Sequence, residues 1–162
     1  MDLNKRAKRV KLLVMDCDGV LTNGRLYFGA SGEELKVFHV RDGQGLHYWH
    51  ATGSRSAIIS GRNSPIVEQR AKELGIGFVL QGRNDKIAAF RELIETAGVM
   101  AEEAAFIGDD VPDAELMPLV GLAVAVADAM PSAKEAAHHV TKKKGGRGAV
   151  REVIDLLLAA HD

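Results

Sequence analysis

The chain has 162 residues, 46% of them hydrophobic, and a formal net charge of −1, which together suit one domain over 1–162 with a single core and argue against a disordered chain. The near-zero charge also argues against nucleic acid or an anionic membrane as a partner, and no apolar run has the length of a signal peptide or a membrane span. Cys17 is the single cysteine and cannot form an internal disulfide, so we expect a protein of the reducing cytoplasm.

The chain opens with a strand-like pattern and then a hairpin-like pattern. Residues 10–15 form a short apolar run, typical of a strand that is buried on both faces. Two β-rich runs within residues 25–40 surround the glycine-containing stretch "GASGEE", which predicts a β-hairpin inserted after the first strand. A short helix over 43–52 and a second buried strand at "SAIIS", 56–60, are predicted next.

Strand and helix patterns then alternate to the end of the chain. Ser64 or Asn63 can cap a helix with Pro65 in its first turn, and Asp85 or Asn84 can start another. Further strands are predicted at 77–81, 104–110 and 122–126, and the last helix has an apolar face formed by Val150, Val153, Ile154, Leu157 and Leu158. This alternation predicts an α/β fold with a doubly wound, Rossmann-like parallel sheet.

Polar side chains follow several of these strands at the points where the strands end. They are Asp16, Asp18, Ser60, Asp109 and Asp110, with Lys86 at the start of a later helix. Because the carboxyl ends of parallel strands form one edge of the sheet, we expect these side chains to meet there. Carboxylates this close repel one another unless a cation intervenes, and Mg²⁺ prefers oxygen ligands. Carboxylates, a metal ion, a lysine and a hydroxyl together predict a phosphate site.

Each of these features has a structural alternative when it is taken alone. A D-x-D pair is common, and "GDD" after a strand is a frequent turn with an Asx cap. Ser60 can simply cap the next helix, and Lys86 can be an ordinary solvated lysine. Arg70 lies on or beside an apolar helical stripe, where it either meets a partner or extends to solvent. The order of the motifs is therefore the stronger indication.

The ordered set "DCDGVLT", "SGR", a helix-opening lysine and "GDD" resembles the haloacid dehalogenase superfamily over residues 10–158. The resemblance implies that Asp16 is the nucleophile, which forms an aspartyl phosphate, and that Asp18 is the general acid and base. It further implies that Ser60 and Lys86 complete the catalytic set and that Asp109, together with Asp16 and Asp18, binds Mg²⁺.

Longer motifs carry a closer resemblance: "FHVRDGQG", "SGRNSPIVEQRAKELGI", "GDDVPD", "VAVADA" and "KKKGGRGAVREVIDLLL". They are similar to the 3-deoxy-D-manno-octulosonate 8-phosphate phosphatase family, which implies a small phosphorylated sugar acid as substrate and a role in lipopolysaccharide precursor synthesis. The substrate contacts that this resemblance implies come from Asp18, His39, Val40, Arg41, Asp42, Gly43, Gly61, Arg62, Arg70 and Lys86. The family usually has Asn in place of His39 and Arg in place of His47, and its members can have a longer C-terminal tail.

Two other functions stay open. A phosphatase for a nine-carbon sialic-acid-type 9-phosphate would use the same chemistry, but such relatives tend to have T-G-E where this chain has Ser60, Gly61 and Arg62. A phospho-receiver signalling domain also combines Asp, Mg²⁺ and Lys on an α/β sheet, but its motifs follow another order. A lasting aspartyl phosphate would favour the receiver, whereas rapid phosphate release would favour a phosphatase.

We expect no separate cap domain over the site. The intervals from Asp18 to Ser60 and from Ser60 to Lys86 are filled by predicted elements, whereas a cap with its own core needs roughly 50 residues or more. The predicted hairpin carries two apolar faces, formed by Leu26 and Phe28 and by Leu35, Val37 and His39. Such a hairpin is marginal alone, so we expect a homo-oligomer, by the family resemblance a tetramer, in which hairpins pack together.

Overall fold

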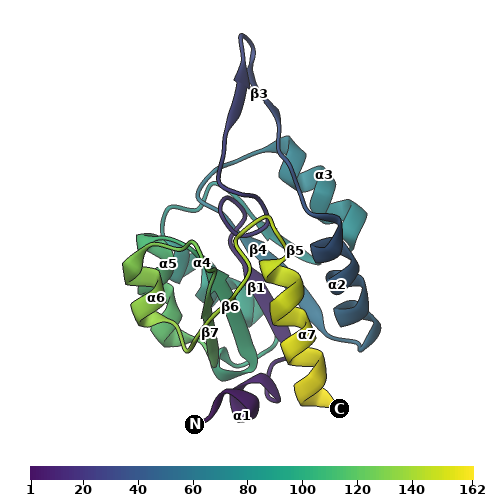
Figure 1. The fold of residues 1–162 in the computed structure, drawn as a ribbon, viewed down its shortest axis with the longest axis vertical. Helices are drawn as coiled ribbons and strands as arrows, with labels where there is room; N and C mark the ends of the chain where they lie inside the picture. Colours follow the sequence, from purple (N-terminus) through teal and green to yellow (C-terminus); the bar gives the residue numbers. More distant parts are fainter.

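A six-stranded parallel sheet forms the centre of the computed structural model, which describes residues 1–162 (Figure 1). Its spatial order is β5-β4-β1-β6-β7-β8, so the chain builds outward from β1 first on one side and then on the other. The strands are β1 Leu12–Met15, β4 Arg55–Ile59, β5 Phe78–Leu80, β6 Ala104–Gly108, β7 Leu122–Ala125 and β8 His139–Val140. The prediction of a doubly wound parallel sheet is confirmed, and its switch point lies beside β1.

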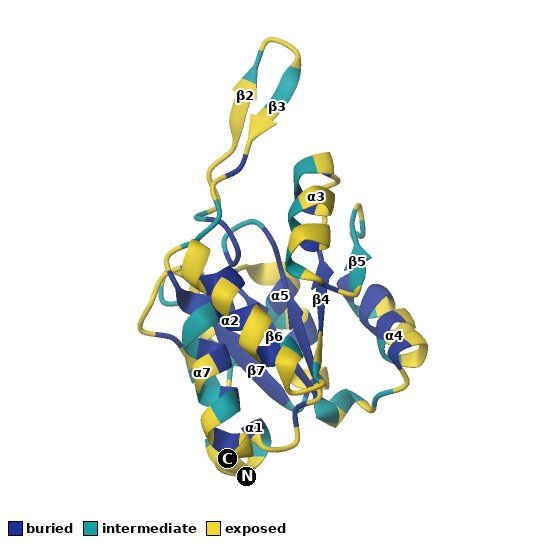
Figure 2. Cartoon of the chain, turned by 90° about the vertical axis from the view of Figure 1, so that its right-hand side faces the viewer, coloured by how far each residue is buried: buried dark blue, intermediate teal, exposed yellow.

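Helices cover both faces of the sheet (Figure 2). On one face α2 packs against α3 and α7, and on the other α5 packs against α4 and α6. The helices are α1 Leu3–Ala7, α2 Val40–Ala51, α3 Pro65–Leu74, α4 Lys86–Ala97, α5 Val111–Leu116, α6 Pro131–Ala136 and α7 Ala149–His161, with two 3₁₀ turns at Ala101–Glu103 and Met117–Leu119. No helix combines the length and the hydropathy that a membrane span requires.

Two helices, α3 and α4, begin at caps predicted from the sequence. Ser64 is the N-cap of α3 with Pro65 at its first position, and Asp85 caps α4 by accepting a hydrogen bond from the Ala88 N–H at 2.9 Å. Gly75 ends α3 in the left-handed region at φ 71°, where residues with a Cβ are disfavoured. Ser60 directly follows β4 and Lys86 is the first residue of α4, and both line one cavity.

Three predicted elements differ from the observed ones. Helix α2 begins at Val40 instead of residue 43, because the His39 side chain accepts a hydrogen bond from the Arg41 N–H and so caps the helix earlier. The fourth predicted strand ends at Gly108, since Asp110 caps α5. The hairpin is shorter than predicted, and residues 36–39 lead into α2 as irregular chain.

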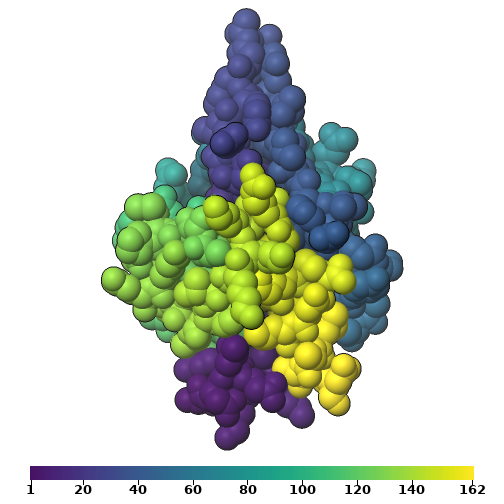
Figure 3. Space-filling model, in the orientation of Figure 1, coloured from purple at the N-terminus to yellow at the C-terminus, as the bar shows by residue number.

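The hairpin of β2 Tyr27–Gly29 and β3 Gly32–Leu35 stands away from the body of the protein, at the end opposite both termini (Figures 1 and 3). Its large apolar side chains are exposed, as the burial colours show (Figure 2). They are Leu26, Tyr27, Phe28 and Leu35, with Val37 just beyond the second strand. The exposed apolar hairpin is therefore confirmed, and its packing against a neighbour stays a prediction.

Candidate active site

The polar residues predicted to meet do lie around one small cavity of about 220 Å³ at the carboxyl ends of β1, β4 and β6. Its walls contain no hydrophobic residue. They are formed by Asp16, Asp18, Ser60, Gly61, Arg62, Lys86, Asp109, Asp110, Pro112 and Asp113. The sheet topology explains this convergence, because the strand ends that carry these residues are neighbours.

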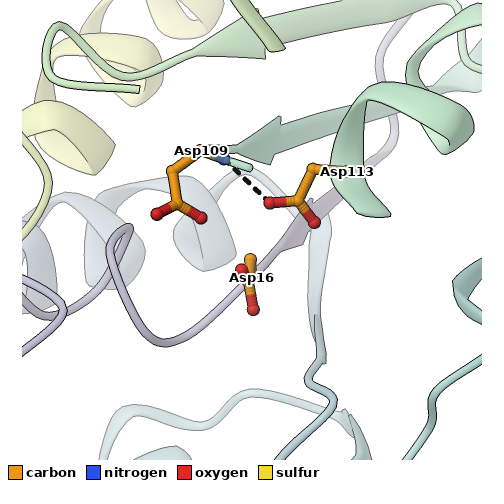
Figure 4. Close-up of side chains that lie close together, drawn as sticks. All are labelled: Asp16, Asp109 and Asp113. Atoms are coloured by element: carbon orange, nitrogen blue, oxygen red, sulfur yellow. Dashed lines mark hydrogen bonds between the residues drawn. The ribbon is translucent and has the colours of Figure 1, made fainter. Parts of the chain in front are cut away.

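Three of the carboxylates that line this cavity lie close together (Figure 4). Asp16 follows β1, Asp109 follows β6, and Asp113 lies in the first turn of α5. Each offers an oxygen that lies within 4.8 Å of the others. Asp113 is further held by two backbone donors, since its Oδ2 accepts hydrogen bonds from the N–H of Asp109 at 2.8 Å and of Asp110 at 3.2 Å.

The acidic cluster is short of positive charge. Lys86 Nζ lies 2.6 Å from Asp113 Oδ1 and 3.2 Å from Asp16 Oδ1, so one ammonium contacts two of the three clustered carboxyl groups. Burial and the charge of Asp113 raise the pKa of Asp16 to about 7, and burial with the charges of Asp16 and Asp113 raises the pKa of Asp109 to about 9. A hard divalent cation that takes oxygen ligands, such as Mg²⁺, fits this donor set.

The Asp18 carboxylate lies outside this cluster. Its Oδ1 accepts a hydrogen bond from Lys36 Nζ at 2.7 Å, and its Oδ2 lies 3.8 Å from Arg62 Nε. The three side chains that meet are thus Asp16, Asp109 and Asp113, which differs from the predicted metal set by one member. Sequence reasoning missed Asp113 although "GDDVPD" contains it, because the six-residue helix that turns it toward Asp109 was not predicted.

The predicted sugar-acid contacts divide into two groups. Gly61 and Arg62 line the cavity of the acidic cluster, whereas residues 39–43 and Arg70 do not. Val40 and Arg70 line a separate cavity of about 410 Å³ together with Lys36, Phe38, Ile66, Gln69 and Glu73. Within one chain, the structure therefore does not bring the whole predicted substrate site together.

Several of these side chains have partners inside the fold. Arg70 does not extend fully to solvent: its guanidinium lies over the Phe38 ring, 5.5 Å from the centroid, and its Nη1 lies 3.3 Å from Glu73, while its buried Nε has no hydrogen-bond partner. The buried Asp42 accepts a hydrogen bond from the Arg151 N–H at 2.9 Å, which ties α2 to the first turn of α7. One oxygen of Asp42 is thus used in packing, while its Oδ2 is buried without a hydrogen-bond partner, and Asp42 lines neither cavity.

Comparison with known proteins agrees with this geometry. The model of the haloacid dehalogenase-like hydrolase family matches residues 75–154. The 3-deoxy-D-manno-octulosonate 8-phosphate phosphatase KdsC of Yersinia pestis is 49% identical over 161 residues, which cover 99% of this chain and 86% of the relative. The chain belongs to this phosphatase family. As a member of it, the chain is a phosphoric monoester hydrolase, and the phospho-receiver alternative is wrong.

Solved structures of the phosphatase family share the fold over nearly the whole chain. The crystal structure of the Yersinia pestis phosphatase has a TM-score of 0.97 and covers 99% of this chain and 87% of its own. A phosphatase from Moraxella catarrhalis, 40% identical, has a TM-score of 0.94 and covers 97% of this chain and 90% of its own. That structure is a complex with a magnesium ion, a phosphate ion and a KDO molecule.

Proposed function

We propose that this chain hydrolyses 3-deoxy-D-manno-octulosonate 8-phosphate to the free sugar acid and phosphate with Mg²⁺, as a cytoplasmic step of lipopolysaccharide precursor synthesis. The observation that carries the proposal is the cluster of Asp16, Asp109 and Asp113, in a chain whose 40% identical relative holds magnesium, phosphate and KDO together. The nine-carbon substrate ranks lower because Arg62 stands in the cavity wall at the position where phosphatases for such substrates tend to have Glu.

In the proposed mechanism Asp16 attacks phosphorus while the bond from phosphorus to the sugar oxygen breaks, which leaves an aspartyl phosphate. Asp18 gives its proton to the departing sugar oxygen and then takes one from the water that hydrolyses the intermediate. Ser60 and Lys86, which line the same cavity, hold the phosphate oxygens. Mg²⁺ held by the acidic cluster would offset the negative charge of the phosphate and the carboxylates.

Released phosphate measured with a panel of sugar phosphates tests this proposal. We expect rapid release from 3-deoxy-D-manno-octulosonate 8-phosphate with Mg²⁺, none after chelation with EDTA, and recovery when Mg²⁺ or Mn²⁺ is restored. Protein carrying Asp16→Asn controls for a contaminating phosphatase. Preference for a nine-carbon 9-phosphate, or full activity after thorough chelation, would contradict the proposal.

We also propose that the single domain works in a homo-oligomer, a tetramer by family resemblance. Two observations support this proposal. Large apolar side chains of the hairpin, such as Phe28 and Leu35, are 58% and 47% exposed. In addition, residues 39–43 and Arg70 lie outside the cavity of their own chain, where a neighbouring copy would help to enclose the sugar.

A further inference from the structure

A buried lysine reaches from the end of the hairpin to Asp18. The side chain of Lys36 is 1% exposed, and its Nζ lies 2.7 Å from Asp18 Oδ1 and 3.0 Å from Glu33 Oε1. Glu33 is held in turn by the Ser64 hydroxyl, which donates a hydrogen bond to Oε1 at 3.1 Å. Lys36 is therefore anchored by the hairpin and by the cap of α3 at once.

The neighbouring carboxylates, Asp18 and Glu33, stabilise the charged form of Lys36. Burial lowers the pKa of Lys36, but hydrogen bonds to Asp18 and Glu33 outweigh this effect, and the pKa lies above its ordinary value. The side chain of Lys36 is 1% exposed and that of Asp18 21% exposed, so desolvation of this pair offsets much of its contribution to stability. Its geometry points instead to a task at Asp18.

We propose that Lys36 is a positioning residue for the general acid: its ammonium holds Oδ1 of Asp18, so that Oδ2 carries the proton that is transferred. When the bond from phosphorus to the sugar oxygen breaks, this proton passes from Oδ2 to that oxygen, and Lys36 neither gains nor loses a proton. The inference rests on the proposed role of Asp18 as general acid. Oδ2 is the less tightly held oxygen, because its cation, Arg62 Nε, lies 3.8 Å away on a 43% exposed side chain, compared with 2.7 Å from Lys36 Nζ to Oδ1.

Substrates that differ only in their leaving group test this inference. We would measure kcat/KM for 4-nitrophenyl, phenyl and glycerol phosphates, which lack the sugar acid and need increasing help from a general acid. Because kcat/KM covers only the steps up to departure of the alcohol, slow hydrolysis of the aspartyl phosphate does not affect it. Lys36→Met should lower kcat/KM about 10²-fold with the phenyl and glycerol esters but only about a few-fold with the nitrophenyl ester. Lys36→Arg, which keeps a cation, should restore most of the loss.

The ratio between two substrates for one variant does not depend on how much of the protein is folded, because both values scale with the active fraction. Lys11→Met is the matched control, since Lys11 Nζ also pairs with a carboxylate, Glu103 Oε1, at 2.6 Å, but far from the site and 66% exposed. Lys11→Met should leave kcat/KM unchanged for all three substrates.

Asp18→Asn separates failure of the inference from failure of the proposed function. In one outcome, Asp18→Asn lowers kcat/KM more for the poorer leaving groups, whereas Lys36→Met lowers it equally for all three substrates. The positioning role of Lys36 is then overturned, while Asp18 remains the general acid. If Asp18→Asn itself shows no such selectivity, the general acid assignment fails, and the inference falls with it.

Discussion

The two aspartates after β1 have different surroundings, and their substitutions should differ accordingly. Asp16→Asn should abolish phosphate release, because an amide is a poor nucleophile and a weak ligand for the metal. Asp18→Asn should leave Mg²⁺ binding largely intact and cost about 10²-fold or more in turnover, as loss of a general acid does. Phosphate release and Mg²⁺ titration on both variants measure this. Near wild-type release by Asp16→Asn would show that another residue attacks phosphorus.

Asp113 should matter as much for the metal as Asp109. Asp109→Ala and Asp113→Ala should each raise the Mg²⁺ concentration needed for half-maximal activity, because each removes one of the three clustered carboxylates. The control is Glu95→Gln, at an exposed carboxylate of α4 that lies outside the cluster and its cavity. An unchanged Mg²⁺ requirement in Asp113→Ala would exclude this residue from the metal site.

The raised pKa values of Asp16 and Asp109 make stability depend on pH. Between the ordinary carboxyl pKa of about 4 and the raised values of about 7 and 9, the folded state binds more protons than the unfolded state. The free energy of unfolding of the metal-free protein should therefore fall as pH rises through this window. Mg²⁺ should raise the Tm more at pH 8 than at pH 5, because it displaces fewer protons there.

Thermal melts in EDTA and in Mg²⁺ across this pH range measure the effect. Asp109→Asn isolates the cluster from other titrating groups, since its metal-free Tm should fall less with rising pH than that of the wild type. If the metal-free Tm of the wild type and of Asp109→Asn changed in parallel with pH, the raised pKa would not belong to Asp109.

At the scale of elements, the end of β6 is packed tightly against α5. A Cβ added at Gly108 would lie 2.4 Å from the Asp113 Cβ, a distance that forces α5 to move. Gly108→Ala should therefore lower the Tm and raise the Mg²⁺ requirement, even though it leaves every carboxylate in place. Gly77→Ala is the control because nothing lies within 4 Å of its added Cβ. A Gly108→Ala variant with wild-type Mg²⁺ dependence would mean that Asp113 can shift without loss.

The elements that the sequence predicted well are those with strong local signals. Capped helices such as α3 and α4, and the apolar runs of β1, β4, β6 and β7, were all foreseen, and with them the convergence of Asp16, Ser60 and Asp109. Helices α5 and α6 have six residues each, too few to establish an apolar stripe, and their position depends on packing. Asp113 was missed for this reason.

Lys36 was missed for a related reason. It follows a hairpin of alternating pattern, where a lysine ordinarily faces solvent. In the folded protein, the residues that follow β3 lie beside the loop that follows β1. Only this contact brings the Lys36 ammonium to Asp18. The alternation within a strand indicates which face a side chain lies on, but not that a distant loop covers that face.

At the scale of the whole molecule, the exposed hairpin should govern assembly. Phe28→Asp should reduce the size measured by light scattering and raise KM, because a charge on the apolar hairpin face opposes its burial against a neighbour. Met100→Asp is the matched control, since Met100 is 55% exposed and precedes the 3₁₀ turn before β6, away from the hairpin. A monomer fully active at nanomolar concentration, or a Phe28→Asp variant unchanged in size and KM, would contradict the oligomer.

The pairing of β1 with β6 has a consequence for how such a protein can diversify. Met15 is registered with Ile107, so the positions of the carboxylates that follow these two strands are set by a backbone ladder that is insensitive to side-chain identity. This ladder does not include three other regions, which can therefore vary without disturbing it: the hairpin, the start of α2 and the surface of α3. The carboxylates that follow these two strands are thus held by the sheet itself, whereas contacts from the hairpin, such as that of Lys36 with Asp18, can change separately.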